Sequence, residues 1–280
     1  MNIQWYPGHM KKTHDLIQEH IKLVDIVVEL LDARAPKSTI NPQFDNLLGQ
    51  KKRLIVLNKA DLADPKVNTL WIRHFEAQGK AVMEFNAKTD PPKRLLDTIA
   101  RVGKFVNEKT AAKGQRPRAI RVMVIGIPNV GKSSLINRLI GKASAKTGDK
   151  PGVTKGKQWL RLGGNVDLFD TPGILWPKFE SEQQALRLAF IGSINDDILD
   201  RYRLSKHLLE AICSSYPEAT VKRFDVACGD IDEMMDAIGR RRGALLPGNQ
   251  IDYDRLSRLL LDEFRGGQLG RISLEKPESV

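Results

Sequence analysis

The sequence predicts an α/β protein with a mostly parallel sheet that carries helices on both faces, followed by a small all-helical C-terminal domain. Two patterns predict the sheet. Apolar runs of strand length alternate with amphipathic stretches, and the phosphate-loop pattern GIPNVGKS at 126–133 joins one such strand to a helix. After residue 181 the chain shows only helical apolar spacing. We therefore expect a nucleotide domain over 1–178, with 1–20 as an N-terminal extension, and a helical domain over 181–280.

Continuous apolar runs identify the expected strands, because parallel strands are buried on both faces. The first run is broken only by Asp25 and Glu29, and the loop 32–36 follows it. Gly163 and Gly164 separate the last two runs and predict a hairpin turn there. In chain order the expected strands are 24–31, 53–57, 81–85, 120–125, 157–162 and 165–169.

The expected helices have apolar residues at helical spacing. A first helical pattern runs through Ile17 and Ile21, and the polar stretch 108–118 is expected to be a linker. In the C-terminal domain, breaks are expected near Pro217 and 243–248. The remaining expected helices are 67–78, 92–107, 134–141, 181–192, 198–214, 230–240 and 252–264.

Composition bounds the kinds of partner. The chain has 280 residues, 41% of them apolar, which is enough for an ordinary core, and a formal net charge of +11. The charge is +8 over 1–120, +6 over 121–180 and −3 over 181–280. Two basic runs, 101–121 and 142–157, hold much of the excess. Either run alone would suit a solvated surface, but both in one phosphate-binding protein favour a polyanionic partner such as RNA.

The two cysteines, Cys213 and Cys228, are too few for a disulfide framework or a zinc site. A reduced cytosolic setting follows from that count. No apolar run approaches the roughly 20 residues of a membrane helix, and the N-terminus lacks a signal-peptide pattern. We therefore expect a cytoplasmic protein without a membrane partner.

The phosphate-loop pattern has a definite chemistry. Its glycines let backbone N–H groups surround phosphate oxygens, and the helix that follows adds a partial positive charge. Lys132 supplies a cation for the β- and γ-phosphates, and Ser133 supplies a hydroxyl for Mg²⁺. The residues expected to bind the nucleotide phosphates are Asn129, Val130, Gly131, Lys132, Ser133 and Ser134.

A second motif, N-K-x-D, follows the strand 53–57 and consists of Asn58, Lys59 and Asp61. A carboxylate at the end of a strand can accept from both N1–H and the 2-amino group of guanine. Adenine offers no such pair of donors and would leave the carboxylate unpaired, so Asp61 predicts selectivity for guanine. One strand and one helix later, the backbone of Asn86, Ala87 and Lys88 is expected to contact the guanine O6.

Residues on the γ-phosphate side follow the phosphate loop. Thr154 lies in a basic segment from which it can close on Mg²⁺ and the γ-phosphate. The tetrapeptide DTPG ends the last strand, where Asp170 is expected to hold the metal through water and the Gly173 N–H to meet the γ-phosphate. The sequence therefore predicts GTP or GDP with Mg²⁺ bound by Ser133, Thr154 and Asp170.

The order of the motifs is unusual, because the guanine motifs precede the phosphate loop, whereas an ordinary Ras-like GTPase has them after it. The chain resembles a circularly permuted Ras-like P-loop GTPase over about residues 20–178. Together with the N-terminal sequence WYPGHM at 5–10, this order resembles the circularly permuted ribosome assembly GTPases. That resemblance implies a role late in assembly of the large ribosomal subunit, with its rRNA and proteins as partners.

The resemblance also bears on catalysis. Ile174 follows the DTPG motif, and an aliphatic side chain cannot orient the attacking water. From the residues alone, His9 can be a buried structural histidine; the resemblance implies instead that it orients this water. The implied activity is GTP hydrolysis that is slow alone and stimulated by the ribosomal subunit. The expected catalytic residues are His9, Lys132, Thr154 and Gly173, and Asn129 matches a residue that helps to hold K⁺ in potassium-activated relatives.

The permutation joins the γ-phosphate sensor covalently to the C-terminal domain, so ordering of the sensor by GTP can reposition that domain. The resemblance implies that this domain touches ribosomal RNA. Two alternatives stay open. The first is a GTP-gated RNA-binding scaffold with negligible turnover. The second is a small-subunit assembly GTPase, which is disfavoured because the chain has neither the length nor the Cys/His cluster for an extra RNA-binding or zinc module.

Overall fold

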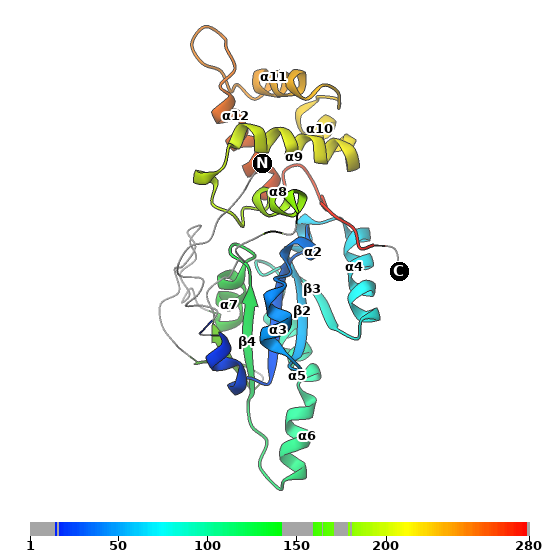
Figure 1. Ribbon diagram of the computed structural model, residues 1–280, viewed down its shortest axis with the longest axis vertical. Coiled ribbons are helices and arrows are strands. Elements are labelled where there is room, and N and C mark those ends of the chain that lie inside the picture. The colour runs from blue at the N-terminus through cyan, green and yellow to red at the C-terminus, as the bar shows by residue number, and fades with distance from the viewer. Residues whose placement is uncertain are drawn as a thin grey trace.

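The computed structural model describes residues 15, 17–141, 159–163, 165–170, 179 and 181–278. One sheet with its covering helices forms the middle of the molecule, and helices α8 to α12 lie at one end of it (Figure 1). Helix α6 projects at the opposite end (Figure 1).

Within the described residues, six strands form a single sheet in the order β3-β2-β1-β4-β6-β5. Every neighbouring pair is parallel except β5 and β6, which form the expected antiparallel hairpin. This mostly parallel sheet confirms the predicted class. The strands are β1 (Ile26–Asp32), β2 (Lys52–Asn58), β3 (Ala81–Phe85), β4 (Ile120–Gly126), β5 (Trp159–Leu162) and β6 (Val166–Asp170).

The register of the parallel strands places their carboxyl ends along one edge of the sheet. Asp32 at the end of β1 pairs with Asn58 at the end of β2, and Asn58 pairs with Phe85 at the end of β3. On the other side of β1, β4 ends at Gly126, opposite Leu30. The loops that follow β1, β2, β3 and β4 therefore meet at the same edge, where open α/β sheets bind their ligands.

Helices cover both faces of the sheet, as predicted. On one face Val28 packs in the same apolar cluster as Leu95 of α5 and Leu135 of α7. On the opposite face Val27 packs in a cluster with Phe44 of α3, while α4 covers the neighbouring strands β1 and β2. The described helices before residue 142 are α2 (Pro36–Thr39), α3 (Gln43–Leu48), α4 (Pro65–Ala77), α5 (Pro92–Val102), α6 (Lys104–Ala112) and α7 (Lys132–Ile140), with the 3-10 turns η1 (Ile21–Leu23) and η2 (Ala60–Leu62).

The expected single helix over 92–107 is wrong, because α5 and α6 meet at Gly103. The sheet approaches this glycine closely: a Cβ there would lie 2.8 Å from Ile120 and 2.9 Å from Ile26. Helix α6 then continues to Ala112, so the linker is shorter than expected.

Helices α8 to α12 make up the helical region, residues 182–265. The four helices expected there are confirmed, but α10 was not expected, because Pro217 was interpreted as a break. Proline fits the first turn of a helix, where its missing N–H has no partner to lose, and Pro217 begins α10. No helix in the described ranges is both long and apolar enough to cross a membrane. The region contains α8 (Glu182–Phe190), η3 (Asp196–Ile198), α9 (Arg201–Ser215), α10 (Pro217–Phe224), α11 (Ile231–Arg241) and α12 (Tyr253–Arg265).

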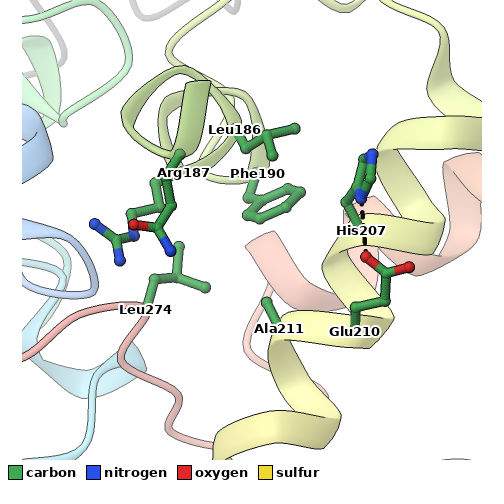
Figure 2. A pocket seen from close by; sticks show the side chains of 8 residues that line it. Leu186, Arg187, Phe190, His207, Glu210, Ala211 and Leu274 are labelled. Carbon is green, nitrogen blue, oxygen red and sulfur yellow. Dashed lines mark hydrogen bonds and ion pairs between the residues drawn. The ribbon is translucent and has the colours of Figure 1, made fainter. Parts of the chain in front are cut away.

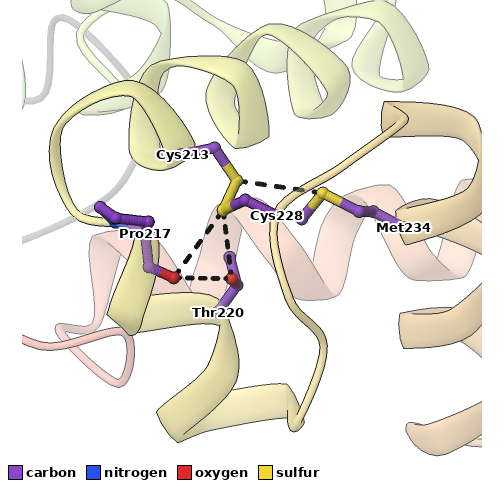
Figure 3. The surroundings of a disulfide bond; sticks show 5 residues. All are labelled: Cys213, Pro217, Thr220, Cys228 and Met234. Atoms are coloured by element: carbon purple, nitrogen blue, oxygen red, sulfur yellow. Dashed lines mark hydrogen bonds between the residues drawn. A yellow bond between two sulfur atoms is a disulfide. The ribbon is translucent and has the colours of Figure 1, made fainter.

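The two cysteines form a disulfide, which the sequence interpretation did not anticipate, so their count no longer supports the reduced setting that was inferred from it (Figure 3). Cys213 lies in α9 and Cys228 lies in the turn after α10, beside Thr220. The chain after α10 folds back toward the start of that helix, so that the Cys228 sulfur lies 3.5 Å from the Thr220 hydroxyl and 3.7 Å from the Pro217 carbonyl, next to the end of α9. The bond closes a loop around α10 and fixes this helix to α9.

After α12 the chain returns to the nucleotide domain as the C-terminal strap, residues 266–278, which runs past α2 and α4 (Figure 1). The Trp71 Nε1–H of α4 donates to the Glu275 carbonyl at 3.3 Å. Residues of both regions share one apolar cluster, from Ile26 of β1 to Ile272 of the strap. The division into 1–178 and 181–280 stays a prediction, and the strap attaches the end of the second unit to the first.

Candidate nucleotide-binding site

Asn58 connects the three nucleotide motifs that the described residues contain. It ends β2 and is 1% exposed. Its side-chain Nδ2–H donates to the Val130 carbonyl of the phosphate loop at 2.8 Å, and its Oδ1 accepts from the Ala87 N–H at 3.1 Å. The loops that the sequence assigns to the base and to the phosphates therefore lie side by side.

Two glycines give the phosphate loop, residues 126–133, its shape. Gly126 and Gly131 have φ values of +156° and +103°. A Cβ at Gly131 would lie 2.3 Å from the Asn58 Nδ2, and one at Gly126 would lie 2.7 Å from the Leu30 carbonyl oxygen. These positions need glycine both for their backbone conformation and for the close approach of neighbouring chain. This tight loop at the start of a helix suits phosphate oxygens.

Lys132 begins α7 and is 8% exposed. Its ammonium donates to the carbonyls of Gly126 and Ile127 at 3.0 and 2.7 Å, so the cation lies inside the curve of the loop. Ser133 and Ser134 follow in the first turn of the helix and are half-buried. A buried cation, a hydroxyl and a helix N-terminus form a donor set that fits a nucleotide di- or triphosphate with Mg²⁺.

The guanine loop, residues 58–63, is attached to the phosphate loop through Lys59. The backbone at Lys59 is left-handed, with φ +56°. Its ammonium donates to the Asn129 carbonyl at 2.8 Å and pairs with the Asp32 carboxylate at 3.0 Å. Lys59 therefore holds the two loops together by a charge-assisted bond.

Asp32 and Arg34 are functional candidates that the sequence interpretation placed in an ordinary loop. Asp32 is completely buried, Arg34 is 1% exposed, and the guanidinium donates to both carboxylate oxygens at 2.9 and 2.8 Å. Burial by itself raises the pKa of Asp32, but the charges of Arg34 and then Lys59 outweigh it and hold that pKa well below its usual range. The signal in the sequence was two charged residues at the end of a buried strand, beside the expected site.

Asp61 lies in η2 and is exposed. Within the described part of the chain, its carboxylate has neither a hydrogen bond nor an ion pair. The backbone N–H groups of residues 86–88, which were expected to be available to the base, all have hydrogen-bond partners within the protein. The Ala87 N–H donates to Asn58, the Lys88 N–H to the Asn86 side chain at 2.8 Å, and the Asn86 N–H to Asp90 at 3.1 Å. An N–H of this loop that met a guanine O6 would have to share its hydrogen with these partners.

Asn129 lies at the tip of the phosphate loop with a left-handed backbone, φ +58°. Its side-chain Nδ2–H donates to the carbonyl of Gly192, just after α8, at 2.7 Å. The phosphate loop thus touches the helical region directly.

The comparisons with known proteins agree with this geometry. The sequence model of a family described as "50S ribosome-binding GTPase" matches residues 121–226. The chain is 47% identical to the ribosome biogenesis GTPase A of Bacillus cereus, over 99% of this chain and 95% of that protein. The chain belongs to the ribosome biogenesis GTPase A family. It is also 33% identical to the mitochondrial ribosome-associated GTPase 1 of Bos taurus, over 98% of this chain and 88% of that one.

Solved structures of similar proteins show the same fold. The GNP-bound crystal structure of YlqF from Thermotoga maritima is 31% identical and has a TM-score of 0.71, with 96% of this chain and all of that chain covered. The GDP-bound YlqF matches with the same identity and score over 94% of this chain. The predicted circularly permuted GTPase fold with a helical C-terminal region is therefore confirmed for this member of the ribosome biogenesis GTPase A family.

For four of the predicted site residues the structure describes no side-chain contact. His9, Thr154 and Gly173 lie outside the described residues. Asp170 is the last residue of β6, and its backbone pairs with Val124, two residues before the phosphate loop. The roles assigned to these four residues stay predictions of the sequence.

A separate cavity of about 300 Å³ lies between α8, α9 and the C-terminal strap (Figure 2). Leu186, Phe190 and Leu274 contribute apolar side chains, and His207 pairs with Glu210 at its edge at 2.9 Å. It contains no residue of the nucleotide motifs.

Proposed function

We propose that this ribosome biogenesis GTPase A family member hydrolyses GTP while bound to a precursor of the large ribosomal subunit, that it promotes a late assembly step, and that hydrolysis releases it. The observation that carries the nucleotide part is the position of Asn58, whose one side chain bonds to the phosphate loop and to the 86–88 loop. The names of the relatives and the description "50S ribosome-binding GTPase" support the ribosomal part.

In this proposal the chain's own residues bind and orient the nucleotide. The carboxylate of Asp61 accepts from N1–H and the 2-amino group of guanine. Lys132 holds the phosphate chain, and the N-terminus of α7 adds its partial positive charge. Ser133, with Thr154 and Asp170, would hold Mg²⁺. A bound Mg²⁺ would neutralise the negative charge that develops on the phosphates during hydrolysis.

Hydrolysis also needs a group that orients the attacking water. Ile174 cannot do this, so we assign the role to His9. Because His9 belongs to the N-terminal extension, we expect the ribosomal particle to order it, which makes turnover slow in its absence. We further assign Asn129 to a K⁺ site beside the phosphates.

For hydrolysis to release the protein from the ribosomal particle, the nucleotide site must be connected structurally to the helical region. The DTPG sensor leads directly into 181–280, and the Asn129 bond to Gly192 adds a second link from the phosphate loop. Ribosomal RNA is the expected partner of the basic runs 101–121 and 142–157. Of the first run, Arg118 is paired with Asp25 and Lys104 with Glu108, while the second run lies outside the described residues. We expect the protein to act in the cytoplasm, where ribosomes assemble.

GTP turnover tests the proposal, measured with the protein alone, with large subunits and with small subunits, in K⁺ and in Na⁺ buffer. We expect acceleration by the large subunit only, and a faster rate in K⁺ than in Na⁺. Acceleration by the small subunit alone would instead make the chain a small-subunit assembly GTPase. His9→Ala is expected to lose the acceleration while it keeps the affinity for GTP.

The second candidate is a GTP-gated RNA-binding scaffold with negligible turnover, which the aliphatic Ile174 favours. It predicts tight GTP binding without acceleration by either particle. The same turnover series distinguishes it from the enzyme.

A further inference from the structure

The guanine loop is held from its outer side by the C-terminal strap. The Arg271 guanidinium donates to the carbonyls of Ala60 and Ala63 at 2.9 and 2.8 Å. The Ile272 N–H donates to the Leu62 carbonyl at 2.9 Å. Three carbonyls of one six-residue loop thus accept hydrogen bonds from a segment more than 200 residues later in the chain, and the Ala60 carbonyl also accepts from the Asn68 side chain at 3.3 Å.

Side-chain packing adds to these bonds. A Cβ at Gly267, where φ is +78°, would lie 2.6 Å from the Leu62 side chain, so this leucine rests directly on the backbone of the strap. Next to the loop, the Asp64 N–H donates to the Ser273 hydroxyl at 3.1 Å. Ile272 is 3% exposed, which shows that this contact excludes water.

Asp61 lies between the residues that the strap holds. Ala60 and Leu62 flank it, and Lys59 on the other side is fixed to Asn129 and Asp32. Within the described residues nothing bonds to the Asp61 carboxylate itself, so its position depends on the backbone of the loop. A bidentate pair with two donors on a base tolerates little displacement of the carboxylate.

We propose that Arg271 is a positioning residue for base selectivity: together with Gly267 and Ile272, it fixes the guanine loop so that Asp61 reaches both N1–H and the 2-amino group. This inference rests on the proposed guanine-nucleotide function. It makes the C-terminal strap part of the nucleotide site. By thermodynamic linkage, a bound guanine base then stabilises the contact between strap and guanine loop by the same free energy by which this contact strengthens base binding.

The test is the ratio of dissociation constants for IDP and GDP, because hypoxanthine keeps N1–H and lacks the 2-amino group. The wild type is expected to prefer GDP. Arg271→Gln is expected to reduce this preference roughly tenfold, the worth of one charge-assisted hydrogen bond. Arg223→Gln is the control, since Arg223 lies in the helical region that precedes the strap and pairs with Glu263, away from the guanine loop.

A second pair of variants avoids any change of charge. Gly267→Ala pushes against Leu62, whereas Gly270→Ala imposes similar backbone strain, at φ +96°, with nothing within 4 Å of the new Cβ. Gly267→Ala is expected to lower the preference for GDP and Gly270→Ala to keep it. The melting temperature of all four variants is measured alongside, since a purely structural role changes stability without changing the IDP to GDP ratio.

The possible failures are distinguishable. A wild type that binds GDP no better than ADP contradicts the proposed guanine function itself. A wild type that prefers GDP, with the same ratio in Arg271→Gln and Gly267→Ala, overturns the role of the strap. If Arg271→Gln does not fold, the comparison of Gly267→Ala with Gly270→Ala decides the question. Arg271→Lys can reach only one of the two carbonyls, so its preference for GDP over IDP is expected to lie between those of the wild type and of Gly267→Ala.

Discussion

At the scale of single residues, the site depends on charges that are removed from water. Asp32, Arg34 and Lys59 form a group in which two cations share one completely buried carboxylate. Arg34 also lies over the Phe264 ring of α12, with its Cζ 5.1 Å from the ring centre. Such a group is costly to disrupt at its centre, because removal of the Asp32 carboxylate leaves the buried Arg34 guanidinium without its counter-charge.

Asp32→Asn is therefore expected to lower the free energy of unfolding by about 3–5 kcal/mol. It is also expected to weaken GDP binding, because Lys59 loses its anchor. Urea unfolding and GDP titration measure the two effects. The control is Asp45→Asn, which removes a 69% exposed partner of Arg53 and is expected to cost less than about 1 kcal/mol. Equal effects of the two substitutions would contradict the role of the buried group.

Glu29, in the middle of β1, gives a pH dependence. Burial raises its pKa from 4.5 to about 7, and Arg53, 3.9 Å away, only partly compensates. Because the folded state binds the proton more tightly than the unfolded chain, stability falls as pH rises from about 4.5 to 7. The fall amounts to about 3 kcal/mol. Unfolding of the wild type and of Glu29→Gln at pH 5 and pH 8 should show this loss in the wild type only; parallel pH profiles would contradict it.

Asp61 gives a prediction about the base. Asp61→Asn is expected to weaken GTP binding and to admit xanthosine triphosphate, whose 2-oxo group would no longer face a carboxylate. Competition binding with both nucleotides measures the change. An unchanged preference for GTP would exclude Asp61 from the base site.

At the scale of elements, the phosphate loop depends on close approach between two strand ends. Gly131→Ala would place a methyl group 2.3 Å from the Asn58 side chain and is expected to abolish tight GDP binding. Gly141→Ala, at the other end of α7, is a matched control. It also has a positive φ, +70°, but open space around the new methyl. It is expected to cost about 1 kcal/mol of stability and to leave nucleotide binding intact. GDP titration of both variants distinguishes the effect of the steric clash with Asn58 from the effect of backbone strain at a positive φ.

At the scale of the whole molecule, Glu275 joins three parts of the chain. Its carboxylate accepts from the N–H and hydroxyl of Ser38 in α2, at 2.8 and 2.7 Å, and from Arg187 of α8 at 2.8 Å. The C-terminal strap, the nucleotide domain and the helical region therefore meet at one buried side chain.

Glu275→Ala is expected to destabilise the protein by about 3 kcal/mol, because it leaves Arg187 and the Ser38 N–H without their acceptor. Glu278→Ala, which removes an 83% exposed partner of Lys37, is expected to have almost no effect. Thermal unfolding compares the two. A loss below about 1 kcal/mol in Glu275→Ala would show that the three parts are held together elsewhere.

The sequence alone determined the strands, most helices, the phosphate loop and the base motif, because each depends on local periodicity or on a short pattern with its own chemistry. The tertiary structure decided what neither local pattern nor spacing can show. It made Asp32 and Arg34 part of the site, paired Cys213 with Cys228, and brought Arg271 to the guanine loop. Such contacts between segments far apart in sequence arise only when strand order and helix packing bring the segments together, so no local signal records them.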